Sequence, residues 1–231
     1  MIVYGRNAVH EAIRGPRTVT HVWATTNAGR EPWLTQSGVR VTLEPSEEIA
    51  RRSGSDGHQG VCAEVSEFRY VEGEELLTQD QALLVALDQV QDPQNLGAIC
   101  RSAECAGAAG VVLPERRAAE VTAAVCKASA GAVEHLPLAQ VRNLTDFLTQ
   151  AKSRGYWCYG ADGDAKLDYR QVDLNGPVVL VMGSEGRGLR PRVAAACDAL
   201  ISLPLRGRIE SLSVGAAAAV LLYAAAAARD R

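Results

Sequence analysis

The sequence lacks every cysteine arrangement that binds a metal or builds a disulfide framework. No two of its six cysteines form a CxxC pair, and none stands at zinc-ligand spacing from one of the four histidines. Isolated cysteines of this kind are typical of small buried side chains in a reducing compartment. The sequence therefore predicts a cytoplasmic protein without a metal site. The cysteines are Cys62, Cys100, Cys105, Cys126, Cys158 and Cys197.

An export signal is also missing, and so is a membrane span. Residues 1–11 contain no basic segment followed by an apolar core. Residues 211–228 carry no charge, but alanine dominates them, and they include two serines and a glycine. Such a segment inserts poorly into a membrane and packs closely against other helices. We therefore expect a soluble protein in which this helix is buried at an interface.

The sequence has no excess of positive charge and no familiar phosphate-binding motif. Its formal net charge is −3, with 24 Lys and Arg against 27 Asp and Glu, which argues against a general polyanion binder. The motifs GxGxxG, GxxxxGKS and GxxxxGKT are absent, so neither the dinucleotide-binding nor the P-loop mechanism applies.

Arginines do cluster locally, because residues 187–208 contain five of them and a single acid, Asp198. The cluster indicates either a focused phosphate-binding surface or an ordinary solvated face, and charge alone does not decide between them. The five are Arg187, Arg190, Arg192, Arg206 and Arg208.

The first part of the chain alternates between short helices and strands, as a small α/β domain does. We place this domain at residues 1–67, with Asn7 as the N-cap of its first helix. An acid-rich segment without strong periodicity follows, and we expect a linker over residues 68–80. Predicted helices span residues 7–14, 31–36 and 46–52, and predicted strands span residues 20–25, 40–43 and 59–66.

Residues 81–231 continue the alternation of strand and helix. Apolar runs such as residues 82–87 and 177–182 are typical of strands that are buried on both faces. The pattern predicts an α/β domain with a mostly parallel sheet and helices on both faces. Its predicted strands span residues 82–87, 110–113, 135–138, 156–161, 177–182 and 200–203. Its predicted helices are one ending near residue 107, then 118–129, 144–154, 190–196 and a long final helix from near residue 211.

Polar residues follow three of these strands, at the position where open α/β sheets bind ligands. Asn95 and Arg101 come after the first strand. They are six residues apart on a helix and lie on different faces, although a long side chain leans back toward the helix start. Arg101 is either an ordinary exposed arginine or, among its small apolar neighbours, a buried one that pairs with an anion.

The second polar segment, residues 182–189, is rich in glycine, which permits close approach of the backbone to a ligand. Its Glu185 suits a ligand with positive charge, unless the segment is only a tight turn with a solvated carboxylate. In the third segment Pro204 ends a strand, and Ser211 or Ser213 is expected to cap the final helix.

The three segments together resemble the motifs of the SpoU-type RNA 2′-O-ribose methyltransferases of the SPOUT superfamily. Residues 92–97 with 101–103 resemble the first motif, residues 181–189 the second, and residues 203–205 with 211–212 the third. Residues 3–9 and 58–60 are similar to the ribosomal-protein-like substrate-binding domain of the 23S rRNA guanosine methylases. The resemblance covers nearly the whole chain.

This resemblance implies an RNA methyltransferase that uses S-adenosylmethionine, with a deep trefoil knot in residues 81–231 and a homodimer formed through the final helix. It implies a guanosine of 23S rRNA as the target, with a tRNA ribose as the alternative. The implied catalytic group is Asn95, Arg101, Glu185 and Ser211. The implied cofactor contacts are Gly183, Glu185, Gly186, Leu203, Leu205, Ser211, Leu212 and Ser213. The expected RNA contacts are Arg6, His58, Arg187, Arg206 and Arg208, although a loop histidine such as His58 can instead cap a strand.

The implied chemistry is transfer of a sulfonium methyl group to a ribose 2′-oxygen. The protein must place the hydroxyl in line and lower the cost of removing its proton. A guanidinium pKa above about 12 makes Arg101 a poor base. We therefore expect Arg101 to stabilise the forming alkoxide or the adjacent phosphate.

Two residues depart from the third motif of the family. Ser213 stands where the family has Asn, and Gly215 stands where Ser is usual. Serine keeps a donor and an acceptor on a shorter arm, which predicts weakened or partner-dependent activity. A non-catalytic RNA-binding relative is therefore the alternative interpretation of this chain.

Overall fold

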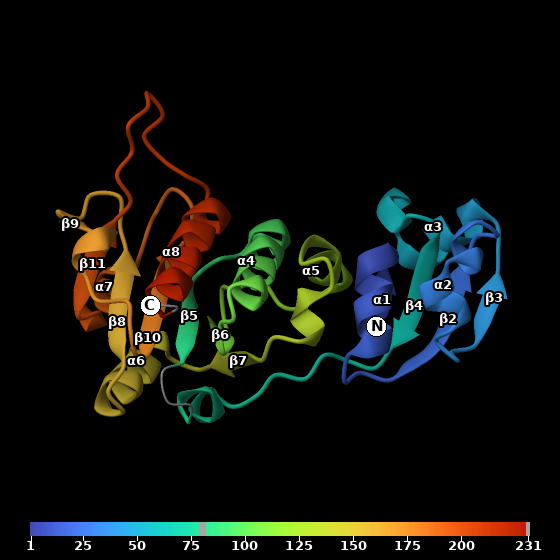
Figure 1. The fold of residues 1–231 in the computed structure, drawn as a ribbon, viewed down its shortest axis with the longest axis horizontal. Coiled ribbons are helices and arrows are strands. Elements are labelled where there is room, and N and C mark those ends of the chain that lie inside the picture. Colours follow the sequence, from blue (N-terminus) through green and yellow to red (C-terminus); the bar gives the residue numbers. More distant parts are fainter. Residues whose placement is uncertain (79–81, 230–231) are drawn as a thin grey trace.

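The computed structural model describes residues 1–78 and 82–229, which form two lobes along the long axis of the molecule (Figure 1). Within the described residues, the N-terminal lobe (residues 1–67) holds a four-stranded sheet in the order β1-β4-β2-β3. Strand β4 is antiparallel to β1 and β2, whereas β2 and β3 are parallel. The elements are β1 (Ile2–Tyr4), α1 (Arg6–Arg14), β2 (Val19–Ala24), α2 (Pro32–Thr35), β3 (Val41–Leu43), α3 (Ser46–Ser53) and β4 (Val61–Val65).

The helices and strands predicted for residues 1–67 are present, with ends shifted by one or two residues. Strand β1 was not expected, because three residues are too few for an alternating pattern to show. Asn7 is not the N-cap, since α1 begins one residue before it. The cap is Gly5, whose φ of 94° few other residues adopt.

The segment after β4 packs onto the C-terminal lobe (residues 82–229) and does not cross freely as a linker. Val71 forms a parallel bridge with Ala139 of the neighbouring sheet. Leu76 and Leu77, in a short 3-10 helix over Gly73–Leu77, are each 5% exposed. The predicted domain boundary between residues 80 and 81 falls outside the described residues.

The C-terminal lobe contains, among its described residues, a seven-stranded sheet in the order β7-β6-β5-β10-β8-β11-β9, and its strand pairs are parallel. The two central strands are buried along almost their whole length, as their apolar sequences predict. The predicted parallel α/β sheet is therefore confirmed. The strands are β5 (Leu83–Asp88), β6 (Gly110–Pro114), β7 (Leu138–Val141), β8 (Trp157–Ala161), β9 (Leu167–Asp168), β10 (Val178–Gly183) and β11 (Ala199–Ser202).

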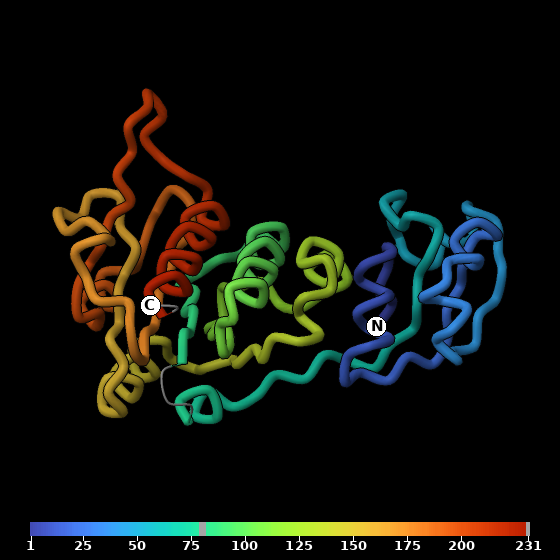
Figure 2. Tube along the Cα trace, viewed as in Figure 1, coloured from blue at the N-terminus to red at the C-terminus, as the bar shows by residue number. Residues whose placement is uncertain are grey.

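Helices cover both faces of this sheet, and the chain can be followed through them in Figure 2. Alternate residues of β5 contribute to two separate cores. Leu83 and Val85 pack on the side of α4 and α8. Leu84 and Ala86 pack on the side of α6 and α7. The helices are α4 (Pro93–Cys105), α5 (Ala123–Ala128), α6 (Leu144–Ser153), α7 (Pro191–Ala196) and α8 (Val214–Arg229).

The predicted helix over residues 118–129 is wrong in its first half, because only Ala123–Ala128 is helical. Residues 118–122 use their amides outside a helix. The amide of Ala119 donates to the carbonyl of Val90 at 2.9 Å. The amide of Val121 donates to the Tyr70 hydroxyl at 2.8 Å. Tertiary hydrogen bonds therefore replace the helical ones that the alanines favour.

Two further boundaries differ from the prediction. Strand β7 begins three residues after the start expected at residue 135, because a 3-10 turn at Ala132–Glu134 comes first. Helix α8 begins at Val214 and not near Ser211. The Ser213 hydroxyl accepts a hydrogen bond from the Ala216 amide at 3.3 Å, which confirms Ser213 as the capping residue. The trefoil knot stays a prediction. No helix in the described ranges is long and apolar enough to cross a membrane.

Candidate active site at the carboxyl ends of the central strands

A polar hollow lies at the carboxyl ends of the neighbouring strands β5 and β10. The sheet continues in opposite directions from these two strands. From β5 the chain proceeds to β6 and β7 on one side, whereas β10 borders β8 on the other. Open α/β sheets bind ligands at such a divergence. The hollow has a volume of about 620 Å³. We call it the strand-end hollow, and it is lined by Gln89, Gln91, Arg117, Ser184, Glu185 and Arg187.

Two residues of the strand-end hollow have an unusual backbone conformation. Gln89 has a φ of 62° and Arg117 a φ of 60°. Only two other non-glycine residues in the described ranges, Gln59 and Ala130, have positive φ. Such conformations cost free energy and concentrate at functional sites. Gln89, Gln91 and Arg117 were not among the predicted site residues, and the only signal for them was polar sequence directly after an apolar strand.

The glycine-rich loop after β10 closes on itself. Ser184 and Gly188 exchange two backbone hydrogen bonds, of 3.1 and 2.9 Å. A Cβ built at Gly183 would lie 2.2 Å from the carbonyl carbon of Gly188, so no other residue fits there without opening the turn. Gly186 and Gly188 have φ of 75° and 64°, and no atom lies within 4 Å of a Cβ built at either. The loop therefore presents an open stretch of backbone beside Glu185.

A buried carboxylate holds this loop against β5. Asp88 is 0% exposed, and its two oxygens accept hydrogen bonds from the Arg190 amide at 2.8 Å and from Arg190 Nε at 2.7 Å. Because Asp88 ends β5 and Arg190 follows the loop after β10, the pair fixes both edges of the strand-end hollow. Neither residue was predicted to act there, although an aspartate directly after a buried strand was a visible signal.

Asp88→Asn is expected to lower the free energy of unfolding by about 2 kcal/mol, because hydrogen bonds to a charged group are worth roughly 1.5–3 kcal/mol each. The amide keeps the shape of the side chain, but its NH2 group is a donor and would face one of the two N–H donors of Arg190. Urea unfolding measures the change, with the exposed Asp164→Asn as the matched control. Equal stabilities of the two variants would contradict a supporting role for Asp88.

The first two predicted segments meet the start of α8, where the third segment ends, beside this loop. A Glu185 carboxylate oxygen accepts a hydrogen bond from the Val214 amide at 3.4 Å, at the first residue of α8. A Cβ built at Gly215 would lie 3.7 Å from the Asn95 side-chain oxygen and 3.3 Å from Ala98 Cβ. The start of α8 therefore contacts both the loop after β10 and the first turns of α4. An anionic side chain at a helix N-terminus is also favourable electrostatically.

The rest of the third segment does not reach the strand-end hollow. Residues 203–213 form an extended loop that projects from the body between β11 and α8 (Figure 1). Leu205 is 42% exposed and Leu212 is 46% exposed, and Ser211 is exposed as well. Leu203 stays partly buried against the core. The structure thus brings Asn95, Glu185 and the residues after Ser213 together, but not Leu205, Ser211 or Leu212.

Arg101 lies elsewhere on α4, and it is exposed, so the interpretation as a buried arginine is wrong. It lines a second hollow of about 410 Å³ between the lobes. We call this the interlobe hollow, and its lining includes Asn7 and Glu11 from the N-terminal lobe and Arg101, Glu104, Cys105 and His135 from the C-terminal lobe. Asn95 and Arg101 do face different sides of α4, as their spacing predicts.

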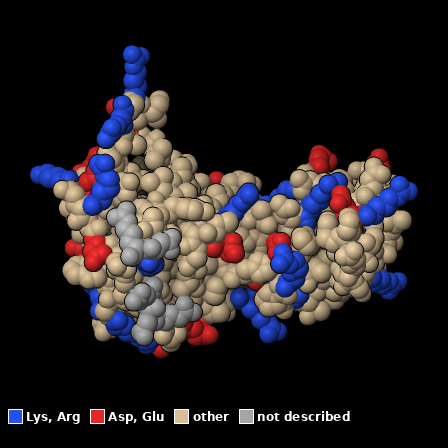
Figure 3. Space-filling view, viewed as in Figure 1, with Lys and Arg blue, Asp and Glu red and all other residues tan. Residues whose placement is uncertain are grey.

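The residues expected to contact RNA lie on both lobes. Arg187 lines the strand-end hollow, and Arg206 and Arg208 are exposed on the projecting loop, where basic side chains gather in Figure 3. On the N-terminal lobe, Arg6 pairs with Glu31 at 3.1 Å. His58, on the same lobe, is only 7% exposed.

The histidine at position 58 has a partner within its own loop. Its Nδ1 accepts a hydrogen bond from the Gly60 amide at 2.9 Å, and its Nε2 lies 3.5 Å from the Ser46 hydroxyl. Of the two roles considered for His58, these contacts favour support of the turn before β4. A contact with RNA would need the side chain to leave both partners.

The described residues offer no site built for metal or thiol chemistry. Among them, no group of three or more His, Cys, Asp and Glu side chains is placed to hold a metal ion. All six cysteines lie in the described part of the chain and are free. Burial raises the pKa of Cys100 and of Cys158 to about 12, so neither thiol forms a thiolate readily at neutral pH.

Comparison with known proteins covers both lobes. The sequence profile of the SpoU rRNA Methylase family matches residues 82–223. A profile described as RNA 2′-O ribose methyltransferase substrate binding matches residues 2–71. The two profiles therefore divide the chain between the two lobes, and the substrate-binding profile extends into the segment after β4.

Relatives extend along nearly the whole chain. An uncharacterized tRNA/rRNA methyltransferase of Mycolicibacterium vanbaalenii is 39% identical over 96% of this chain and 74% of that protein. The 23S rRNA (guanosine-2′-O-)-methyltransferase RlmB of Pseudomonas syringae is 38% identical over 96% of this chain and 94% of that protein. A crystal structure of AdoMet-bound rRNA methyltransferase from Sinorhizobium meliloti has a TM-score of 0.80 at 28% identity, over 97% of this chain and 85% of that chain. The chain is therefore an RNA methyltransferase that belongs to the SpoU rRNA methylase family.

Proposed function

We propose that the chain transfers the methyl group of S-adenosylmethionine to a ribose 2′-oxygen of RNA, with a guanosine of 23S rRNA as its target. The observation that carries the proposal is the strand-end hollow, where Glu185, the glycine-rich loop and the start of α8 meet. The Pseudomonas syringae relative supports the substrate, and the AdoMet-bound structure from Sinorhizobium meliloti supports the cofactor. An rRNA target would place the enzyme in the cytoplasm.

The strand-end hollow fits S-adenosylmethionine in volume, and its lining carries charges of both signs, Glu185 against Arg117 and Arg187. Its 620 Å³ lies within the range of about 300–1,000 Å³ for small-molecule sites. The carboxylate of Glu185 suits a ligand with a positive centre, and the open space at Gly186 and Gly188 lets a ligand approach the backbone. When bound, the cofactor supplies an electrophilic methyl group on a positively charged sulfur. Contacts from Leu205 and Leu212 require the projecting loop to fold toward the hollow.

The side chains of this protein would then position the ribose and lower the cost of its deprotonation. Asn95 and Glu185 lie beside the start of α8 and are proposed to orient the reacting groups there, with Ser211 added when the loop folds in. Arg101 is proposed to stabilise the forming alkoxide or the adjacent phosphate, because its guanidinium stays protonated.

Arg101 and Glu185 line separate hollows within one chain. We propose that a homodimer through α8 joins them, so that Arg101 of one copy completes the strand-end hollow of the other. Helix α8 carries the exposed side chains of Val220, at 43%, and Tyr223, at 54%, and it packs on α4, which bears Arg101. An apolar helix face of this kind suits a contact between two copies.

Ribose-methylation mapping of rRNA and tRNA, from cells with and without the gene, tests the proposed function. A single 2′-O-methylated guanosine of 23S rRNA that is lost with the gene is the expected result. Loss of a tRNA methyl group instead would favour the tRNA alternative. Calorimetry with S-adenosylmethionine distinguishes the methyltransferase from a non-catalytic RNA-binding relative, because the latter would bind RNA but not the cofactor.

Ser213→Asn, which restores the residue usual in the family, is expected to raise the affinity for S-adenosylmethionine about threefold to tenfold, the effect of one added hydrogen bond. Stability should not change, because Asn caps a helix as well as Ser does. Calorimetry measures the affinity, and Ser213→Ala is the matched control that removes the cap. An unchanged affinity would show that the departure from the motif costs nothing.

A further inference from the structure

The interlobe hollow brings polar groups from both lobes together, and the proposed function gives a role to Arg101 alone among them. Asn7 and Glu11 of α1 form one wall. Arg101 and Glu104, three residues apart on one face of α4, belong to the opposite wall. Neither Arg101 nor Glu104 has an ion-pair partner among the described residues, and the two are not paired with each other. The Glu104 carboxylate is therefore available to a ligand of the hollow, and the Arg101 guanidinium stays free for the role proposed above.

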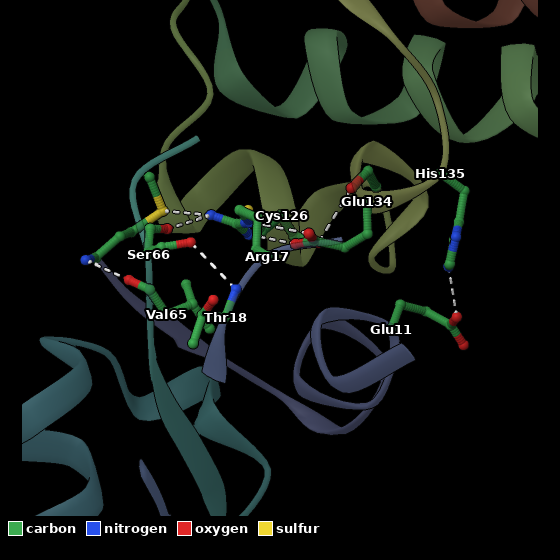
Figure 4. A network of polar contacts seen from close by, with 10 residues as sticks. Glu11, Arg17, Thr18, Val65, Ser66, Cys126, Glu134 and His135 are labelled. Atoms are coloured by element: carbon green, nitrogen blue, oxygen red, sulfur yellow. Dashed lines mark hydrogen bonds and ion pairs between the residues drawn. The ribbon is translucent and has the colours of Figure 1, made fainter. Parts of the chain in front are cut away.

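The two walls are held at a fixed separation by contacts between the lobes. The carboxylate of Glu11 lies 2.8 Å from His135 Nε2 across the hollow's edge (Figure 4). Deeper in the interface, Arg17 Nε donates to the Glu134 carboxylate at 2.8 Å, and these side chains are 6% and 0% exposed. An ion pair with two hydrogen bonds between charged groups is a strong contact, and separation of the lobes would lose both of them.

Close backbone packing adds to this restraint. Gly131 has a φ of 87°, and a Cβ built there would lie 2.6 Å from Glu11 Cβ. Its neighbour Ala130 is one of the few non-glycine residues with positive φ, at 53°, and it also lines the hollow. The turn that carries these residues therefore fits against α1 in a conformation that the contact between the lobes maintains. The interlobe hollow is preformed.

The charges of the hollow select the kind of ligand. Two carboxylates, Glu11 and Glu104, disfavour a phosphate group, whereas the Glu104 carboxylate, which is free of ion pairs, suits a neutral group with N–H donors. A volume of about 410 Å³ admits a planar heterocycle with its sugar. Among the four RNA bases, guanine alone presents two adjacent N–H donors, N1–H and the N2 amino group, which match the two oxygens of one carboxylate.

We propose that the interlobe hollow binds an unpaired guanine base of the RNA substrate, with Glu104 accepting hydrogen bonds from N1–H and the N2 amino group. This inference rests on the proposed function in that it takes the substrate to be RNA. The hollow then anchors the RNA to both lobes at once, and Asn7 supplies the contact from the N-terminal lobe. Unpaired bases are the features that proteins read most often in RNA.

Titration of the intact protein with GMP, IMP and AMP tests the inference, followed by NMR of the four histidine side chains. GMP is expected to shift the resonances of His135 and to leave those of His21 and His58 in place. IMP lacks the N2 amino group and should bind more weakly, and AMP weaker still. Glu104→Gln should lower the affinity for GMP about tenfold, since one bidentate contact to a base is worth roughly 1–3 kcal/mol. The same substitution should lower the affinity for IMP by a smaller factor.

Glu47→Gln, on the exposed part of α3, is the matched control for the loss of one carboxylate and should leave the GMP affinity unchanged. Asn7→Ala should weaken GMP binding as well, because the N-terminal lobe contributes to the site. Equal binding of GMP and AMP would mean that the hollow recognises phosphate, and it would overturn the inference. So would a GMP titration that leaves His135 unshifted. S-adenosylmethionine binding by calorimetry is measured on the same samples, so that failure of this inference is distinguished from failure of the proposed function.

Discussion

Gly183→Val is expected to abolish S-adenosylmethionine binding while the sheet stays folded. A Cβ at this position would lie 2.2 Å from the Gly188 carbonyl carbon and 2.5 Å from the Leu189 amide nitrogen. Both are backbone atoms, so they cannot rotate aside as a side chain does. The two hydrogen bonds between Ser184 and Gly188 must break to make room, and the open backbone beside Glu185 is lost with them.

Calorimetry measures this result directly, at a cofactor concentration that saturates the unchanged protein. Gly163→Val is the matched control, because Gly163 is exposed and no atom lies within 4 Å of a Cβ built there. Circular dichroism of both variants reports whether the fold is kept. If Gly183→Val bound the cofactor within a few-fold of normal, the glycine-rich loop would not be the cofactor site.

Arg101→Ala is expected to lower the rate of methyl transfer by a factor of about 10²–10³, the usual effect of removing one group that stabilises a developing oxyanion. S-adenosylmethionine affinity should stay the same, because Arg101 is proposed to act on the ribose oxygen or the adjacent phosphate and not on the cofactor. Arg101→Lys should recover only part of the rate, since an ammonium lacks the planar fork of donors. Single-turnover kinetics with labelled cofactor separates the chemical step from binding.

A mixture of two inactive variants tests whether the homodimer joins the two hollows. Arg101→Ala and Glu185→Ala are co-expressed with different tags. If each active site combines Arg101 and Glu185 from different copies, a mixed dimer keeps one intact site. In a random mixture half of the dimers are mixed, and each mixed dimer has one intact site out of two. The mixture should therefore recover about a quarter of the normal activity. Absence of any recovery would contradict a shared site and favour an arrangement within one chain.

Most of the sheet could be predicted from the sequence, because its strands are short apolar runs between polar loops. β5 and β10 illustrate this, since both were predicted to within one residue at each end. The first half of the helix expected over residues 118–129 could not be. Its alanines favour a helix, but Ala119 and Val121 donate their amides to distant parts of the chain, and no local pattern records those partners.

The candidate site divides in the same way. Asn95 and Glu185 both lie beside the start of α8, as positions at the ends of parallel strands lead one to expect, while their role in the site stays a prediction. The positive φ of Gln89 and Arg117 has no signal in residue type, because such conformations are imposed by the surrounding fold. The sequence left open whether Arg101 is exposed or buried, and the structure shows it exposed, since its small neighbours face the core while it faces the gap between the lobes.

The hydrogen bond between Glu185 and the first amide of α8 has a thermodynamic consequence for the proposed dimer. A ligand that attracts the Glu185 carboxylate competes for that amide and changes how the first turn of α8 is held. If two copies associate through the same helix, cofactor occupancy and association are linked equilibria. If the cofactor changes the dimerisation constant by some factor, dimerisation must change the affinity for the cofactor by the same factor.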